Sequence, residues 1–153
     1  HFISVRHPTF NHMQLAQGKK VYFLSDFHLG APDFQQSLAR EKRLVKFLDQ
    51  IAEDAAAIFV VGDLFDFWYE YKSVVPKGFV RILGKLATLT DSGIPIYFFV
   101  GNHDMWMNGY FEKELNIPQS GMSMAFWNHS SQYWYWTRQL PQQKKPCCNR
   151  TNG

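Results

Sequence analysis

The chain has 153 residues, of which 46% are hydrophobic and 17% aromatic; this indicates one globular domain with a sizeable core and excludes a disordered chain. The net charge of +3 is unevenly placed, because residues 1–118 hold 12 Lys and Arg against all 13 Asp and Glu, whereas the last 35 residues hold four basic residues and no acid. No apolar run approaches the roughly 20 residues that span a bilayer, so we expect no transmembrane segment. Four spread positive charges are weak grounds for a nucleic-acid partner, and we expect none.

Residues 1–18 show no clean period and are expected to form an irregular extension. From residue 19 to residue 118, short apolar runs alternate with apolar residues at helical spacing. This alternation predicts an α/β fold with a mostly parallel sheet flanked by helices. The expected strands are 21–24, 58–61 and 96–100, and the expected helices are 35–53, 79–90 and 110–115.

The pattern changes at residue 119. Aromatic and polar residues mix there without a clear period, and the acidic residues are gone. We expect residues 119–153 to be an aberrant or disordered tail. Two interpretations of it stay open: a frameshift or gene-prediction error, or a membrane-interface role for Trp127, Trp134 and Trp136.

Polar motifs follow the first two predicted strands. Asp26-Phe27-His28 places a carboxylate and an imidazole two positions apart, so in an extended segment both side chains lie on one side and can bind one metal ion. In Gly62-Asp63 the glycine permits close backbone approach, and the carboxylate can bridge two metals or cap a helix.

The third predicted strand ends at Gly101-Asn102-His103-Asp104. The amide oxygen of Asn102 can bind a metal without adding negative charge beside a phosphate. His103 is then placed to donate a proton to a leaving oxygen or to stabilise a phosphoryl group, and Asp104 to orient the imidazole. The competing interpretation is a simple turn, because Gly-Asn suits positive φ.

Order and spacing favour one joint site. Asp26 and Asp63 are 37 residues apart, and Asp63 and Asn102 are 39 apart, which is about one strand–helix unit each time. Because the carboxyl ends of parallel strands meet at one edge of a sheet, we expect the three motifs to form a single metal site there.

The sequence resembles the calcineurin-like metallophosphoesterases, in whose N-terminal half Asp-x-His, Gly-Asp and Gly-Asn-His-Asp follow in this order. Residues 23–32, 61–71 and 99–106 are similar to the branch of that family that acts on UDP-2,3-diacylglucosamine in lipid A biosynthesis, in its Bacteroidetes form. The resemblance covers residues 19–118. It implies the N-terminal half of an α/β/β/α sandwich.

The resemblance also implies a site with two divalent metal ions, often manganese. Asp26 and His28 would bind the first metal, Asp63 would bridge, and Asn102 would bind the second. Asn102 and His103 would contact the substrate phosphate, with His103 and Asp104 as catalytic residues.

The implied reaction is hydrolysis of the pyrophosphate bond of UDP-2,3-diacylglucosamine to 2,3-diacylglucosamine 1-phosphate and UMP. The substrate is a lipid-linked nucleotide, so the resemblance implies a cytoplasmic enzyme that is peripheral to the inner membrane. Two interpretations stay open for the aromatic residues after Asp63, namely the lining of a lipid or nucleotide pocket, or core and rim packing. These residues are Phe65, Phe67, Trp68, Tyr69 and Tyr71.

The family pattern continues with a His-Gly-Asp loop, a helical insertion and a Gly-His-x-His loop, and none of these follows Leu115. His129 matches neither loop and receives no role. We therefore expect this chain to be incomplete and weakly active or inactive. The alternatives are another calcineurin-like phosphoesterase with a different phosphoester substrate, and a non-catalytic fragment.

Overall fold

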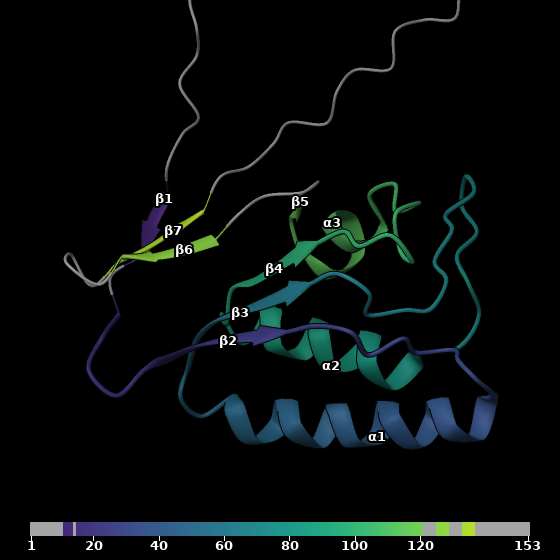
Figure 1. Ribbon diagram of the computed structural model, residues 1–153, viewed down its shortest axis with the longest axis horizontal. Helices are drawn as coiled ribbons and strands as arrows, with labels where there is room; N and C mark the ends of the chain where they lie inside the picture. The colour runs from purple at the N-terminus through teal and green to yellow at the C-terminus, as the bar shows by residue number, and fades with distance from the viewer. Residues whose placement is uncertain (1–10, 14, 121–124, 129–132, 137–153) are drawn as a thin grey trace, which may run out of the picture.

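The computed structural model describes residues 11–13, 15–120, 125–128 and 133–136. Figure 1 shows a parallel sheet with two long helices packed along one of its faces. The elements are β1 (Asn11–Met13), β2 (Lys20–Leu24), α1 (Phe34–Ile51), β3 (Ala55–Val61), α2 (Val80–Asp91), β4 (Ile96–Phe99), α3 (Tyr110–Leu115), β5 (Gln119–Ser120), β6 (Ala125–Asn128) and β7 (Tyr133–Trp136).

The main sheet has the strand order β2-β3-β4-β5, and every pairing in it is parallel. The apolar strand β3 lies in the interior of the sheet, where Ile58 pairs with Tyr22 of β2 and with Ile96 of β4. The α/β fold and the six predicted helices and strands are thus confirmed. The parallel pairing also continues past residue 118, since Phe99 pairs with Ser120 of β5.

Helices α1 and α2 lie along one face of the sheet (Figure 1), and their apolar stripes are buried in the main core. Buried residues of these stripes include Leu44 and Leu48 of α1 and Leu86 of α2. The other face carries a smaller cluster around Phe59, whose ring stacks at 5.0 Å on that of Phe23 and at 4.9 Å on that of Tyr97.

A buried carboxylate joins the two helices. Helix α2 follows Phe79, which is in the left-handed conformation and provides no side-chain cap. Instead Glu41 of α1, only 4% exposed, accepts hydrogen bonds from the backbone nitrogens of Arg81 at 3.0 Å and Ile82 at 3.1 Å. Glu41 therefore satisfies two amides that the first turn of a helix leaves without intrahelical partners.

A second, antiparallel sheet has the strand order β1-β7-β6. Asn11 pairs with Trp136, so a segment of the expected extension 1–18 lies beside a segment of the expected tail. The domain boundaries at residues 18 and 118 stay predictions. Residues 137–153 of the tail lie outside the described residues. Among the helices that are described, none is long and apolar enough to cross a membrane.

Candidate metal centre

The three motifs meet at one edge of the parallel sheet, as their order along the chain predicts. Their loops follow β2, β3 and β4 directly and are hydrogen bonded to one another. The backbone nitrogens of Phe27 and His28 both donate to the carbonyl oxygen of Asp63 at 3.0 Å. The backbone nitrogen of His103 donates to Oδ1 of Asp63, also at 3.0 Å. Asp63 is thus the residue on which the other two loops converge.

Two glycines permit this convergence. A Cβ atom at position 62 would lie 3.0 Å from the Cα of Gly101, and one at position 101 would lie 2.6 Å from the backbone nitrogen of Asp63. Both distances are too short for a side chain to fit without movement of the backbone. The two loops therefore approach this closely because Gly62 and Gly101 carry no Cβ. Asn102 lies in sequence between Gly101 and His103, which both lie against Asp63, and its side chain is exposed.

One group of candidate metal ligands consists of Asp26, His28 and Asp63, whose ligand atoms all lie within 4.8 Å of one another. Two carboxylate oxygens and an imidazole nitrogen suit a divalent metal ion. The expected extended conformation of Asp26-Phe27-His28 is wrong, because Asp26 has φ 59° and His28 has φ 43°. The ligands converge through a change of chain direction at these two left-handed residues, called the turn below, which the two amide donations to Asp63 hold in place.

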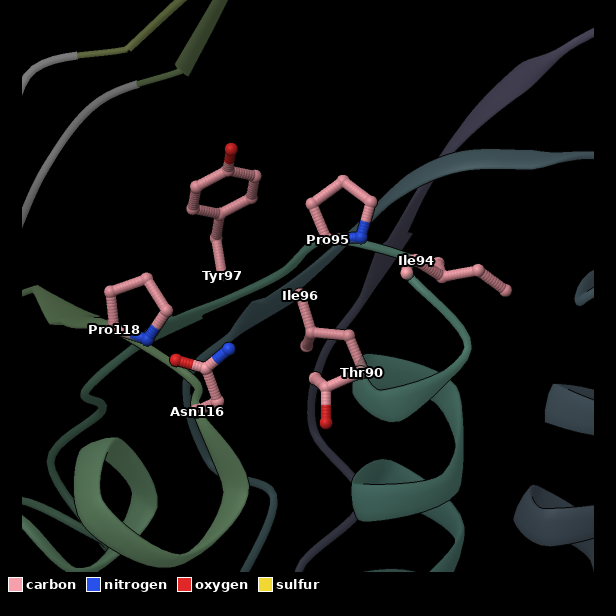
Figure 2. A pocket seen from close by; sticks show the side chains of 8 residues that line it. Thr90, Ile94, Pro95, Ile96, Tyr97, Asn116 and Pro118 are labelled. Carbon is pink, nitrogen blue, oxygen red and sulfur yellow. The ribbon is translucent and has the colours of Figure 1, made fainter.

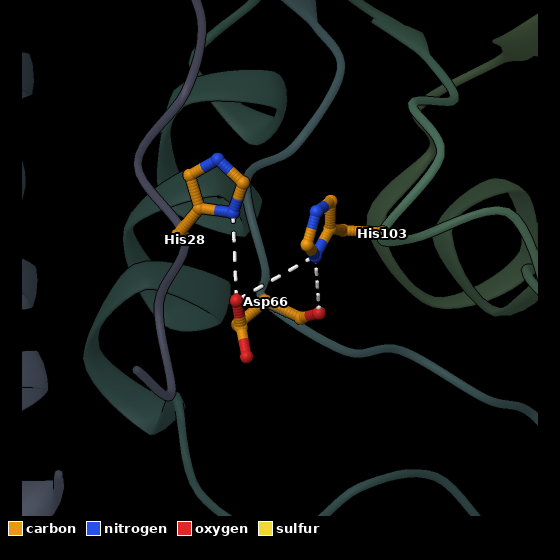
Figure 3. A group of neighbouring side chains, drawn as sticks. All are labelled: His28, Asp66 and His103. Atoms are coloured by element: carbon orange, nitrogen blue, oxygen red, sulfur yellow. Dashed lines mark hydrogen bonds and ion pairs between the residues drawn. The ribbon is translucent and has the colours of Figure 1, made fainter. Parts of the chain in front are cut away.

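A second group, shown in Figure 3, consists of His28, Asp66 and His103. The Nδ1 atoms of the two histidines each lie 3.5 Å from Oδ1 of Asp66, and their rings are 4.6 Å apart and nearly perpendicular. Nδ1 of His103 also lies 2.9 Å from the backbone carbonyl oxygen of Asp66. Asp66 was not among the site residues expected from the sequence, although an acidic residue only three positions after Asp63 could have indicated a second carboxylate near the site.

Asp66 lies beside one of the two ring nitrogens of His28. Nδ1 of His28 faces the carboxylate of Asp66, while Nε2 lies 4.0 Å from Oδ1 of Asp26. A histidine that binds metal through one nitrogen usually donates its other N–H to a carboxylate or carbonyl. The geometry therefore fits metal binding through Nε2 of His28 on the side of Asp26.

Asp104 has a different position from the expected one. Its side chain is fully buried, with Oδ1 accepting from the backbone nitrogen of Gly101 at 2.7 Å and Oδ2 from that of Leu64 at 3.0 Å. Burial raises the pKa of Asp104, although these hydrogen bonds act in the opposite direction. The prediction that Asp104 orients the imidazole of His103 is wrong, because Asp66 makes that contact. Asp104 instead joins the loops after β3 and β4.

The aromatic residues after Asp63 divide between the two open interpretations. Phe65 and Trp68 are fully buried in the core, whereas Phe67, Tyr69 and Tyr71 are exposed. A cavity of about 290 Å³ lies elsewhere, at the amino end of β4, and contains none of the candidate ligands (Figure 2). Its lining includes Thr90, Ile96, Tyr97 and Asn116.

A protein family and several individual proteins are similar in sequence to this chain. The profile of the calcineurin-like phosphoesterases matches residues 19–145. A protein of Porphyromonas gingivalis named UDP-2,3-diacylglucosamine hydrolase is 50% identical over 96 residues, which are 63% of this chain and 37% of that protein. A protein of the same name from Actinobacillus succinogenes is 34% identical over 98 residues, which are 64% of this chain and 40% of that protein. Another from Vibrio vulnificus is 35% identical over 97 residues, which are 62% of this chain and 37% of that protein. The chain thus spans well under half the length of these relatives.

Proposed function

Because the chain belongs to the calcineurin-like phosphoesterase family, we propose that it carries out metal-dependent hydrolysis of the pyrophosphate bond of UDP-2,3-diacylglucosamine, giving 2,3-diacylglucosamine 1-phosphate and UMP. The observation that carries this proposal is the convergence of Asp26, His28 and Asp63 within 4.8 Å at the carboxyl edge of the sheet. The substrate is proposed from the name of the relatives, of which the chain spans 37–40%.

In this proposal Asp26 and His28 bind a first divalent ion, Asp63 bridges to a second, and Asn102 binds the second, with manganese as the ion. Two such ions, when bound, activate water as a nucleophile and neutralise charge on the phosphoryl oxygens. The protein holds its ligands in place through hydrogen bonds between the loops, chiefly those that Phe27 and His28 donate to the carbonyl oxygen of Asp63.

We assign His103 to the substrate phosphate. A carbonyl oxygen can only accept a hydrogen bond, so Nδ1 of His103, at 2.9 Å from the carbonyl of Asp66, carries a proton. Nε2 is then the nitrogen that can donate to a leaving oxygen or stabilise charge on a transferring phosphoryl group. Asp66 acts through His103 and His28 as a positioning residue.

We also propose that the protein is cytoplasmic and binds the surface of the inner membrane, where a lipid-linked substrate is reached. Exposed aromatic side chains beside the candidate site support this proposal. Tyr69 pairs with Trp106 in a short bridge, the rings of Phe67 and Trp106 are 5.7 Å apart, and Nζ of Lys72 lies 5.4 Å from the ring centre of Tyr71. Aromatic and basic residues together suit the interface of an anionic bilayer.

The test is release of UMP from UDP-2,3-diacylglucosamine by the 153-residue chain in the presence of Mn²⁺, compared with the D63N variant. D91N is the matched control, because Asp91 is exposed at the end of α2. The expected result is at most weak UMP release, in line with the expectation from the sequence, and any release should require Mn²⁺ and Asp63 but not Asp91.

Two other outcomes separate the alternatives. Cleavage of an aryl phosphodiester without UMP release would assign the chain to a different phosphoesterase activity. Absence of both hydrolysis and calorimetrically detected Mn²⁺ binding would overturn the proposal in favour of a non-catalytic chain.

A further inference from the structure

Helix α1 presents polar side chains to the loop that holds Asp26 and His28. Nη1 of Arg40 donates to the carbonyl oxygens of Phe27 at 2.6 Å and of His28 at 2.9 Å. One turn earlier, the buried hydroxyl of Ser37 accepts a hydrogen bond of 2.8 Å from the backbone nitrogen of Gly30. These contacts join the helix to the backbone of the metal-binding loop, whereas an ordinary surface arginine would extend into solvent.

The backbone of this loop requires such support. Asp26 and His28 have φ values of 59° and 43°, in the left-handed region that is uncommon for residues other than glycine, although Asp and His adopt it more often than most. The nitrogens of Phe27 and His28 are directed to the carbonyl of Asp63, and the carbonyls of the same two residues are directed to Arg40. The turn is therefore held from both sides, by the second loop and by the helix.

We propose that Arg40 is a positioning residue of the metal centre, whose guanidinium holds Phe27 and His28 in the turn that directs the side chains of Asp26 and His28 toward Asp63. The inference rests on the proposed metal-dependent function. No residue of the sequence motifs predicts this role, because Arg40 lies in the helix that follows and has the spacing of a solvated surface position.

Loss of the charge of Arg40 and loss of its hydrogen bonds are expected to change the metal affinity in opposite directions. In the described part of the chain, none of the ion pairs includes Arg40. Its positive charge next to a candidate ligand disfavours a nearby cation by Coulomb repulsion. Removal of the charge alone would strengthen metal binding. Removal of the hydrogen bonds would weaken it, because the ligands lose their orientation.

The experiment compares R40M, R40K and R43M with the parent chain. R43M is the matched control, since Arg43 is exposed on the same helix and its replacement removes the same charge. The first readout is the Mn²⁺ dissociation constant from calorimetry, at a temperature at which circular dichroism shows every variant to be folded. The second is the set of Cα and Cβ chemical shifts of Asp26 and His28 in the metal-free protein, which report their backbone conformation.

We expect R40M to bind Mn²⁺ about 10- to 100-fold more weakly, the range typical of residues that hold metal ligands. R40K, which keeps the charge but not the planar fork, is expected to lie between R40M and the parent. R43M should bind as the parent does. In R40M the shifts of Asp26 and His28 should also move toward those of extended backbone.

Unchanged or tighter Mn²⁺ binding by R40M, with parental shifts, would overturn the role of Arg40 while the metal site itself stands. A parent chain that binds no Mn²⁺ would contradict the proposed function. The shifts of metal-free R40M would then still decide the inference about the turn, because they do not depend on metal.

Discussion

Nδ1 of His103 lies 2.9 Å from the backbone carbonyl oxygen of Asp66. This hydrogen bond keeps a proton on Nδ1 and leaves Nε2 as the nitrogen that can face the leaving oxygen. We predict that H103Q lowers the rate of UMP release by about 10²- to 10⁴-fold, the usual contribution of a general acid. Mn²⁺ binding by Asp26, His28 and Asp63 should be unchanged, because that ligand group does not include His103. Retained UMP release would show that His103 takes no part in catalysis.

The carboxylate of Asp66 faces Nδ1 of His28 as well as Nδ1 of His103. In D66N the imidazole of His28 loses its carboxylate partner, and its Nε2 becomes a weaker metal ligand. We expect an Mn²⁺ affinity about 10- to 100-fold lower, measured by calorimetry. D49N serves as the control, since Asp49 lies on α1 and pairs with Lys85 of α2. Equal losses in D66N and D49N would contradict a specific role for Asp66.

Gly101 is predicted to tolerate no side chain. In G101A the new Cβ would lie 2.6 Å from the backbone nitrogen of Asp63, so the two loops must separate. We expect destabilisation by about 1–3 kcal/mol together with weaker Mn²⁺ binding. In G84A nothing lies within 4 Å of the new Cβ, and Gly84 is inside α2, so this variant should gain about 0.5–1 kcal/mol. Urea unfolding of both variants checks the prediction, and a neutral G101A would contradict it.

Glu41 is predicted to be needed for stability although it is an acidic residue in a buried position. In E41A the backbone nitrogens of Arg81 and Ile82 lose their acceptor, with an expected loss of about 1–3 kcal/mol in the free energy of unfolding. E41Q keeps one acceptor oxygen and should lose less. K42A, at an exposed position on the same helix, is the control. In a urea titration K42A should be the most stable of the three variants and E41A the least stable, with E41Q between them.

The stability contributed by Asp54 should depend on pH. The hydrogen bond from Lys20 and that from Tyr22 lower the pKa of Asp54. Because the pKa is lower in the folded state, the ionised carboxylate stabilises the protein at pH values above the pKa of Asp in the unfolded chain, about 3.9. This contribution is lost as the pH falls through the folded pKa. D54N should therefore be less stable than the parent at pH 7, with the difference shrinking below about pH 4. Urea unfolding at several pH values measures it, and a difference independent of pH would contradict the prediction.

Strands and helices were predictable because their signals are local. The apolar run of residues 58–61 and the helical spacing of Leu44 and Leu48 depend only on neighbours within a few positions of the chain. The meeting of the three motifs was predictable for a similar reason, since parallel strands deliver their carboxyl ends to one edge.

The contacts inside the site were not predictable in the same way. Asp66 and Arg40 contact histidines or backbone atoms that lie 12 or more residues away in sequence. Asp104 joins Gly101, three residues before it, to Leu64, which is 40 residues away. An aspartate next to a histidine in sequence, such as Asp104 next to His103, points elsewhere once the loops pack. The left-handed turn at Asp26 and His28 also has no glycine to indicate it.

The sequence by itself determined the fold class, the order of the motifs and the edge of the sheet at which they meet, because hydrophobic periodicity and strand direction are encoded locally. Only the tertiary structure decided how the ligands are oriented. It assigned the histidines to Asp66, buried Asp104 between two loops and placed Arg40 behind the turn of Asp26 and His28. These choices depend on which backbone donors and acceptors remain unsatisfied when the loops pack together, and that is a property of the folded chain alone.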